Sequence, residues 1–87
     1  MAEIRVTPLD DATFQVTVTD KSTTTHEVKV QADYALKLTG GKITTAQLVK
    51  ESFKFLLERE PNTSILPSFD LSVIARYFPE YERILGK

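Results

Sequence analysis

Residues 43–61 read ITTAQLVKESFKFLLEREP, and this stretch decides the fold. Thr44, followed three residues later by Gln47, forms a capping box, in which the two side chains satisfy free N–H groups at the start of a helix. Pro61 sets the far limit, because proline disfavours helical geometry in the residue before it. The pattern predicts one amphipathic helix that begins after Thr44 and ends before Pro61.

The apolar side of this predicted helix is broad. At about 100° per residue, the apolar side covers about 200° of the helix, and charged side chains fill about 100° of the remainder. A surface helix that rests on one sheet needs little more than about 100° of apolar arc. We therefore expect it to pack both on a sheet and against the carboxyl-terminal helix. The residues of the apolar side are Leu48, Val49, Ser52, Phe53, Phe55, Leu56 and Leu57.

The amino-terminal third has the two-residue period of half-buried strands. Apolar and polar residues alternate over Thr13–Thr19 and again over Thr25–Gln31, and the polar segment Asp20–Thr24 between them has the length of a hairpin turn. Glu3–Thr7 alternates as well and is followed by turn-forming proline and aspartates. These three segments predict an antiparallel meander with one apolar face and one threonine-rich, solvated face.

The turn also predicts how the second and third strands pair. One register keeps the apolar side chains of both strands on the same face. The predicted cross-strand pairs are Phe14 with Val30, Val16 with Val28, and Val18 with His26.

The remainder of the chain has helical signals. Asp33 can cap a short helix that Gly40 and Gly41 end, because glycine accepts the left-handed conformation common just past a helix. Further along, Asp70 has the position of an N-cap for a third helix. Pro79 then either kinks that helix or starts a new one at its first turn.

These patterns together predict a single α+β domain over residues 1–87. We expect an antiparallel sheet in residues 1–32 and a helical layer in residues 33–87. The predicted architecture is a three-stranded antiparallel meander packed on a carboxyl-terminal bundle of two to three helices. In the loop 62–68, Ile65 and Leu66 are expected to tuck under the core.

Composition favours an ordinary globular protein. The chain is 41% hydrophobic and 26% charged, with a net charge of −1, and it contains no cysteine. The absence of cysteine fits a reducing compartment, and no apolar run approaches the roughly 20 residues of a membrane helix, so a cytoplasmic location is expected. A balanced charge also argues against a strongly basic nucleic-acid surface.

The residues that commonly carry chemistry are few. His26 is the only histidine, and its predicted place on the inward side of a strand favours a structural role. Gly40-Gly41-Lys42 lacks the spacing of a phosphate-binding loop and is better read as a helix end. We therefore predict no catalytic, metal-binding or cofactor-binding residues.

The most informative polar positions are Arg59 and Glu60, which both fall within the apolar arc of the central helix. The side chain of Arg59 has two interpretations. One interpretation is structural: its stem covers the region of Phe69 and Leu66 while the guanidinium pairs with Asp70 or Glu82. The other interpretation is a partner-binding groove between the helices, since arginine and tyrosine are enriched at interface hot spots. The groove residues would be Arg59, Arg76, Tyr77 and Tyr81.

The carboxyl-terminal half contains three distinctive stretches: FLLEREP from Phe55, SIL from Ser64, and FDLSVIARYFPEYE from Phe69 to Glu82. In these motifs the chain resembles a family of small uncharacterised prokaryotic proteins. The resemblance implies a self-contained prokaryotic cytoplasmic domain. It assigns no activity and no functional residues.

The leading functional hypothesis is a small non-enzymatic protein that binds a protein partner or acts as a regulatory module. Self-association through an open edge strand, either Glu3–Thr7 or Thr25–Gln31, is one form of it. The alternative is a nucleic-acid-binding regulator that uses a basic helix face. Its candidate residues are Lys42, Lys50, Lys54, Arg76 and Arg83.

Overall fold

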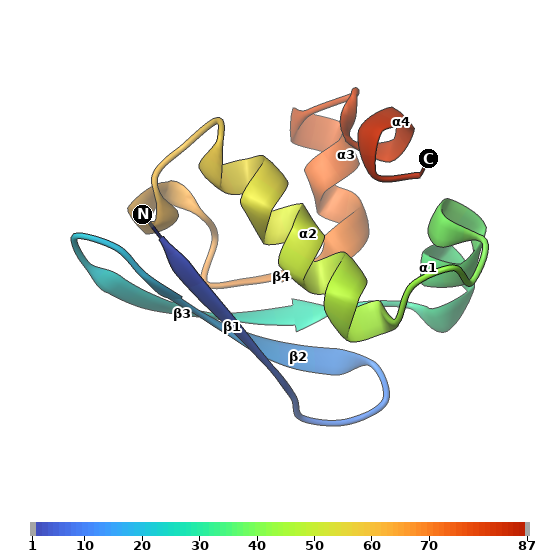
Figure 1. The fold of residues 1–87 in the computed structure, drawn as a ribbon, viewed down its shortest axis with the longest axis horizontal. Coiled ribbons are helices and arrows are strands. Elements are labelled where there is room, and N and C mark those ends of the chain that lie inside the picture. The colour runs from blue at the N-terminus through green and yellow to red at the C-terminus, as the bar shows by residue number, and fades with distance from the viewer. Residues whose placement is uncertain (1, 87) are drawn as a thin grey trace.

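The computed structural model describes residues 2–86 and contains one mixed sheet with several helices (Figure 1). The strands are β1 (Glu3–Pro8), β2 (Thr13–Thr19), β3 (Thr23–Lys29) and β4 (Ser68–Asp70). The α-helices are α1 (Ala32–Thr39), α2 (Thr45–Leu57), α3 (Ile74–Tyr77) and α4 (Tyr81–Leu85). Two short 3₁₀ turns complete the list, η1 (Asn62–Ser64) and η2 (Leu71–Val73). No helix among residues 2–86 has the length and apolar character needed to cross a bilayer.

The sheet has the order β1-β2-β3-β4. Its first three strands form the predicted antiparallel meander, and α+β architecture is confirmed. The three-strand prediction was incomplete, because β4 pairs with β3 in parallel and brings a strand from the helical half of the chain into the sheet. β3 is therefore an inner strand, and the division into a sheet in 1–32 and a helical layer in 33–87 does not hold. A strand of three residues is too short to show an alternating pattern.

The predicted register of β2 and β3 was wrong by two residues. Val16 lies opposite His26, because three turn residues, Asp20–Ser22, connect the strands where five were expected. A shift of two positions leaves every side chain on the same face of the sheet, so the hydrophobic pattern alone could not detect it. The other two revised pairs are Phe14 with Val28 and Val18 with Thr24.

Helix α2 is the centre of the molecule, as predicted. Its capping box is present: the Gln47 backbone N–H donates to Thr44 Oγ1 at 3.1 Å, and the Thr44 N–H donates to Gln47 Oε1 at 2.9 Å. The helix contacts both β1 and β2 of the sheet and also α4, which explains its wide apolar side. It ends earlier than expected, at Leu57, so Arg59 and Glu60 lie in the turn that follows.

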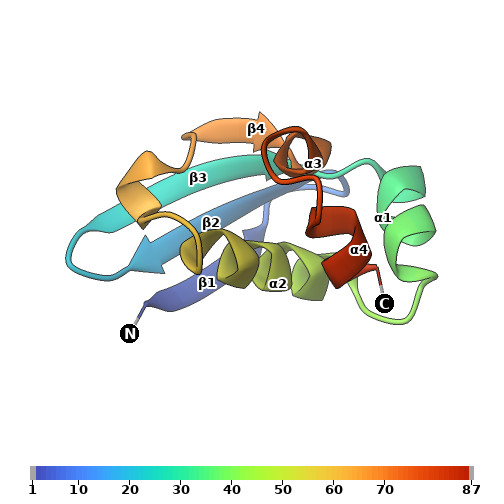
Figure 2. The same cartoon turned by 90° about the horizontal axis from the view of Figure 1, so that it is seen from above.

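The helices all lie on one side of the sheet (Figures 1 and 2). The inward-facing residues of the sheet and helices form one buried cluster. It contains Phe14, Val16, Val18, Val28, Val30, Ala35, Leu48, Val49, Phe53, Phe55, Leu56, Ile65, Leu71, Ile74 and Tyr81. The opposite face of the sheet carries polar side chains, many of them threonines, in agreement with the alternation of the sequence.

The short helices refine three predictions. α1 has Gln31 as its N-cap in place of the expected Asp33. Its C-cap is Gly40, whose φ of 66° confirms the predicted left-handed conformation just past the helix. Asp70 is an N-cap as predicted, since its carboxylate accepts from the Ser72 N–H at 3.0 Å, but the helix that it starts opens with the η2 turn. The chain leaves helical geometry after Tyr77, and a new helix starts at Tyr81, so the Pro79 segment separates two helices.

Candidate functional site

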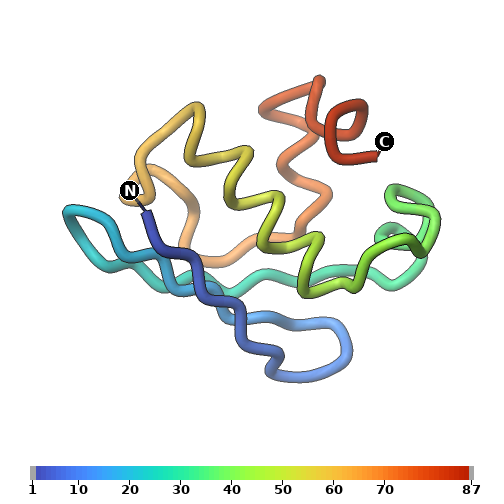
Figure 3. The backbone as a smooth tube through the Cα atoms, viewed as in Figure 1, coloured from blue at the N-terminus to red at the C-terminus, as the bar shows by residue number. Residues whose placement is uncertain are grey.

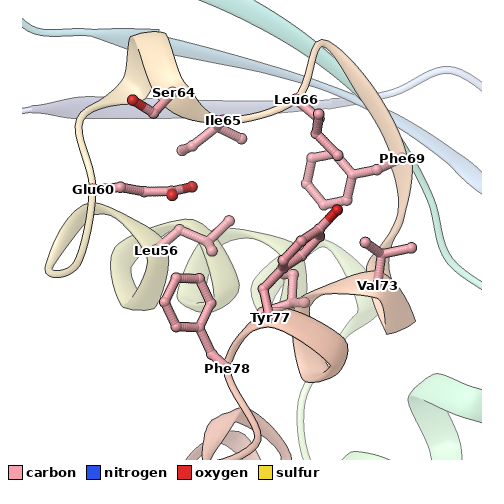
Figure 4. Close-up of a pocket in the computed structure, with 10 residues that line it drawn as sticks. Leu56, Glu60, Ser64, Ile65, Leu66, Phe69, Val73, Tyr77 and Phe78 are labelled. Atoms are coloured by element: carbon pink, nitrogen blue, oxygen red, sulfur yellow. The ribbon is translucent and has the colours of Figure 1, made fainter.

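A groove opens between the carboxyl end of α2, the loop from η1 to β4, and helix α3 (Figure 4). Its volume is about 390 Å³, enough to hold one or two large side chains. The residues that line it are mostly apolar: Leu56, Glu60, Ser64, Ile65, Leu66, Phe69, Val73, Ile74, Tyr77 and Phe78.

The floor of the groove belongs to the hydrophobic core. Leu56, Ile65 and Ile74 are each buried, with exposed fractions of 6% or less. They come from α2, the loop after η1, and α3, so the elements that pack the core also fix the shape of the groove. Such a floor is held in one arrangement by close packing.

The rim of the groove exposes two large hydrophobic side chains. Leu66 is 46% exposed and Tyr77 is 68% exposed. The prediction that Leu66 tucks under the core was wrong, whereas Ile65 does so. Large apolar groups left in water next to a concave surface are typical of places where another molecule binds.

His26 fixes the loop that carries Leu66. The histidine ring is only 2% exposed and lies 5.4 Å from the Phe53 ring, and its Nδ1 lies 2.8 Å from the Leu66 carbonyl oxygen. Because a carbonyl only accepts, Nδ1 carries a hydrogen, and in the neutral ring Nε2 accepts from the Thr24 hydroxyl at 2.8 Å. Both nitrogens are thus engaged, which supports the predicted structural role.

Asn62 extends this network to the β2–β3 turn. Its Nδ2 donates to the Ser22 carbonyl and to Thr24 Oγ1, each at 2.9 Å, and lies 3.4 Å from the Val18 carbonyl. The backbone trace places η1 and this turn at the same end of the molecule (Figure 3). A buried amide therefore ties the chain after α2 to the sheet.

Arg59 does not lie where the structural interpretation placed it. Its guanidinium carbon lies 3.6 Å from the centre of the Phe55 ring, and Nη1 donates to the Phe55 carbonyl at 3.0 Å. The guanidinium pairs with Glu80 at 3.3 Å and Glu58 at 3.2 Å, and neither Asp70 nor Glu82 is its partner. The prediction failed because it assumed that the helix continues through Arg59. The helix ends at Leu57, and from the turn that follows the Arg59 side chain reaches different neighbours.

Tyr81 is a core residue and does not border a groove. Its ring is fully buried against Phe55, at a centroid distance of 5.4 Å, and its hydroxyl lies 2.7 Å from Ser52 Oγ. Since Ser52 donates its own hydrogen to the Leu48 carbonyl, Tyr81 donates to Ser52. Burial raises the pKa of the Tyr81 hydroxyl to about 12.

The raised pKa of Tyr81 predicts a loss of stability in alkali. The folded state holds the proton more tightly than the unfolded chain, whose pKa is near 10, so the stabilisation is complete below pH 10 and is lost as the pH rises through about 12. We expect the difference in unfolding free energy between the natural chain and a Tyr81→Phe variant to fall by up to about 1.4 kcal/mol per pH unit in this window. Urea unfolding at several alkaline pH values measures it.

The comparison with Tyr81→Phe isolates this group. Burial also raises the pKa of Tyr34, whose hydroxyl donates to Glu82 at 2.8 Å, but Tyr34 is present in both proteins. A constant difference between the two proteins from about pH 9 to about pH 11 would contradict the assignment.

Of the four predicted partner-binding residues, Tyr77 is the one that lines the groove. Arg76 is exposed on α3 beside it, Arg59 lies in the turn after α2, and Tyr81 is buried. Glu60, Leu66 and Phe69 were missed as groove residues. Two sequence signals pointed to this region: Glu60 falls within the apolar arc of the predicted helix, and an apolar pair, Ile65 and Leu66, lies in an otherwise polar loop.

The basic residues of the alternative hypothesis are spread over several segments. Each of the five is exposed, and Lys54 pairs with Glu51 at 3.0 Å on the outer face of α2. Lys42 precedes α2, whereas Arg76 and Arg83 belong to α3 and α4. Residues 2–86 contain no group of three or more histidine, aspartate or glutamate side chains that could hold a metal ion.

The chain was also compared with protein-family models, curated proteins and solved structures, and none of them matched it.

Proposed function

We propose that this chain is a small non-enzymatic protein-binding module that holds a short segment of a partner protein in the groove between α2, the η1–β4 loop and α3. The observation that carries the proposal is the combination of a buried apolar floor with two large hydrophobic side chains exposed at the rim, Leu66 and Tyr77. Binding energy at protein interfaces is concentrated where aromatic and aliphatic anchors enter such pockets.

The geometry around the groove supports a binding role. His26, the chain's only histidine, has both ring nitrogens committed to holding the loop of the groove. Arg59 is likewise committed to Phe55 and Glu80. The hydrogen bonds and ion pairs of these polar side chains thus hold the walls of the groove in place, which suits a preformed docking surface.

The proposal predicts that groove variants lose binding while they stay folded. Heptapeptides selected from a random display library on the natural chain should bind at least about tenfold more weakly to a Leu66→Ser, Tyr77→Ser double variant. Both side chains are exposed, so each substitution should change the unfolding free energy by no more than about 0.5 kcal/mol. Titration calorimetry and urea unfolding measure the two quantities.

Leu36→Ser is the matched control. Leu36 is 62% exposed but lies in α1, which contributes no residue to the groove. Selected peptides should bind this variant as tightly as the natural chain. Equal loss of binding in the control and in the double variant, or full binding by the double variant, would overturn the assignment of the groove.

A further inference from the structure

The groove contains one charged side chain, Glu60. The side chain extends from the turn after α2, and its carboxylate points into the groove toward the space above Leu56 (Figure 4). The other residues that line the groove are apolar, apart from Ser64 and Tyr77, which carry hydroxyl groups. A carboxylate in such surroundings loses part of its hydration and interacts strongly with any cation that enters.

Within residues 2–86, no ion pair or side-chain hydrogen bond occupies the Glu60 carboxylate. The adjacent cation, Arg59, is directed elsewhere, since its guanidinium stacks on Phe55 and pairs with Glu58 and Glu80. Glu60 is half-buried, so a carboxylate lies in an apolar groove and residues 2–86 supply no side-chain partner for it.

Three aromatic residues line the same groove: Phe69, Tyr77 and Phe78. The face of an aromatic ring attracts cations, and the aliphatic stem of lysine or arginine packs well on apolar surface. A groove with aromatic walls and one carboxylate therefore matches a long side chain that is apolar along its length and positive at its end.

We propose that the groove selects a partner segment with a basic side chain flanked by apolar residues, and that Glu60 pairs with the cationic head. This inference rests on the proposed function of the groove and names the chemistry of its occupant. The basic stem lies along Leu56 and Phe78, and the flanking apolar residues cover Leu66 and Tyr77 at the rim.

The test uses three acetylated and amidated pentapeptides of sequence Gly-Leu-X-Leu-Gly, in which X is lysine, norleucine or glutamate. Each is titrated into the ¹⁵N-labelled protein, and the backbone amide shifts of Ser64, Leu66 and Tyr77 report binding in the groove. The lysine peptide should bind about tenfold tighter than the norleucine peptide, a ratio that corresponds to about 1.4 kcal/mol. The glutamate peptide should bind most weakly, and the preference for lysine should shrink as salt is added.

Glu60→Gln should abolish the preference for lysine over norleucine. Glu51→Gln is the matched control, because it removes the same charge from a side chain of α2 that does not line the groove and does not contact Arg59. The control should keep the full preference. Loss of the preference in both variants would show that net charge, and not Glu60, sets the selectivity, which overturns the inference.

Two further outcomes separate this inference from the proposed function. Equal binding of the lysine and norleucine peptides in the groove of the natural chain would overturn the selection of a cation and leave the docking groove in place. If none of the three peptides shifts the groove amides, the inference and the peptide-binding groove are both wrong.

Discussion

Tyr81→Ala is expected to lower the unfolding free energy by about 3–5 kcal/mol, the cost of removing a large buried aromatic side chain. Tyr81 is fully buried, and its ring meets Phe55 edge to face at an interplanar angle of 67°. It also attaches α4 to α2 through Ser52. Because single domains are stable by only about 5–15 kcal/mol, this loss should leave the protein close to unfolding at physiological temperature.

Tyr81→Phe is the matched control for that result. It keeps the ring and removes only the bond that the hydroxyl donates to Ser52, so it should cost about 1 kcal/mol. Urea unfolding followed by circular dichroism gives both values. If the alanine variant lost no more stability than the phenylalanine variant, the contact between α4 and α2 would contribute nothing to the fold.

The second large effect is expected from Asn62→Asp. The substitution keeps the shape of a side chain that is only 4% exposed, but it replaces a donor with a carboxylate that faces the carbonyl oxygen of Ser22 and the hydroxyl of Thr24. A buried charge without a partner costs about 3–5 kcal/mol, and the loss of unfolding free energy should be of that size near neutral pH.

Asn62→Ala separates the charge from the lost hydrogen bonds. It leaves acceptors unsatisfied without adding a charge and should cost about 1–3 kcal/mol. The gap between the aspartate and alanine variants should narrow as the pH is lowered, because the introduced carboxyl then takes up a proton. Chemical denaturation over a range of pH measures this gap. A larger loss in the alanine variant at neutral pH would contradict the role of Asn62 as a donor.

Local sequence signals were sufficient to predict most of the helices and strands. The capping box at Thr44 and the glycine at Gly40 each mark a helix end through contacts made within a few residues, and both were read correctly. The alternation over Thr13–Thr19 likewise reports a strand with one buried face. Such features can be predicted because neighbouring residues in the sequence determine them.

The features that were not predicted from the sequence depend on residues that are far apart in the chain. β4 is a strand because β3 pairs with it, and Asn62 is buried because the β2–β3 turn accepts its hydrogens. The groove has the same origin, since its walls come from α2, the η1–β4 loop and α3. Tyr77 could be named from composition, but its neighbours at the groove could be found only from the fold.

The parallel pairing of β3 with β4 has a consequence for how the protein opens. Glu27 pairs with Ser68 and Lys29 with Asp70, so this edge of the sheet joins residues that are far apart in the sequence. Such contacts form slowly, because the long intervening chain must first be ordered. The antiparallel hairpins join near neighbours, and their amides should be the last to exchange with deuterium. Amides of residues 66–78 should exchange first, through local unfolding that disrupts the groove while the hairpins stay folded. Capture of a partner would then close this opening and slow exchange in the same segment.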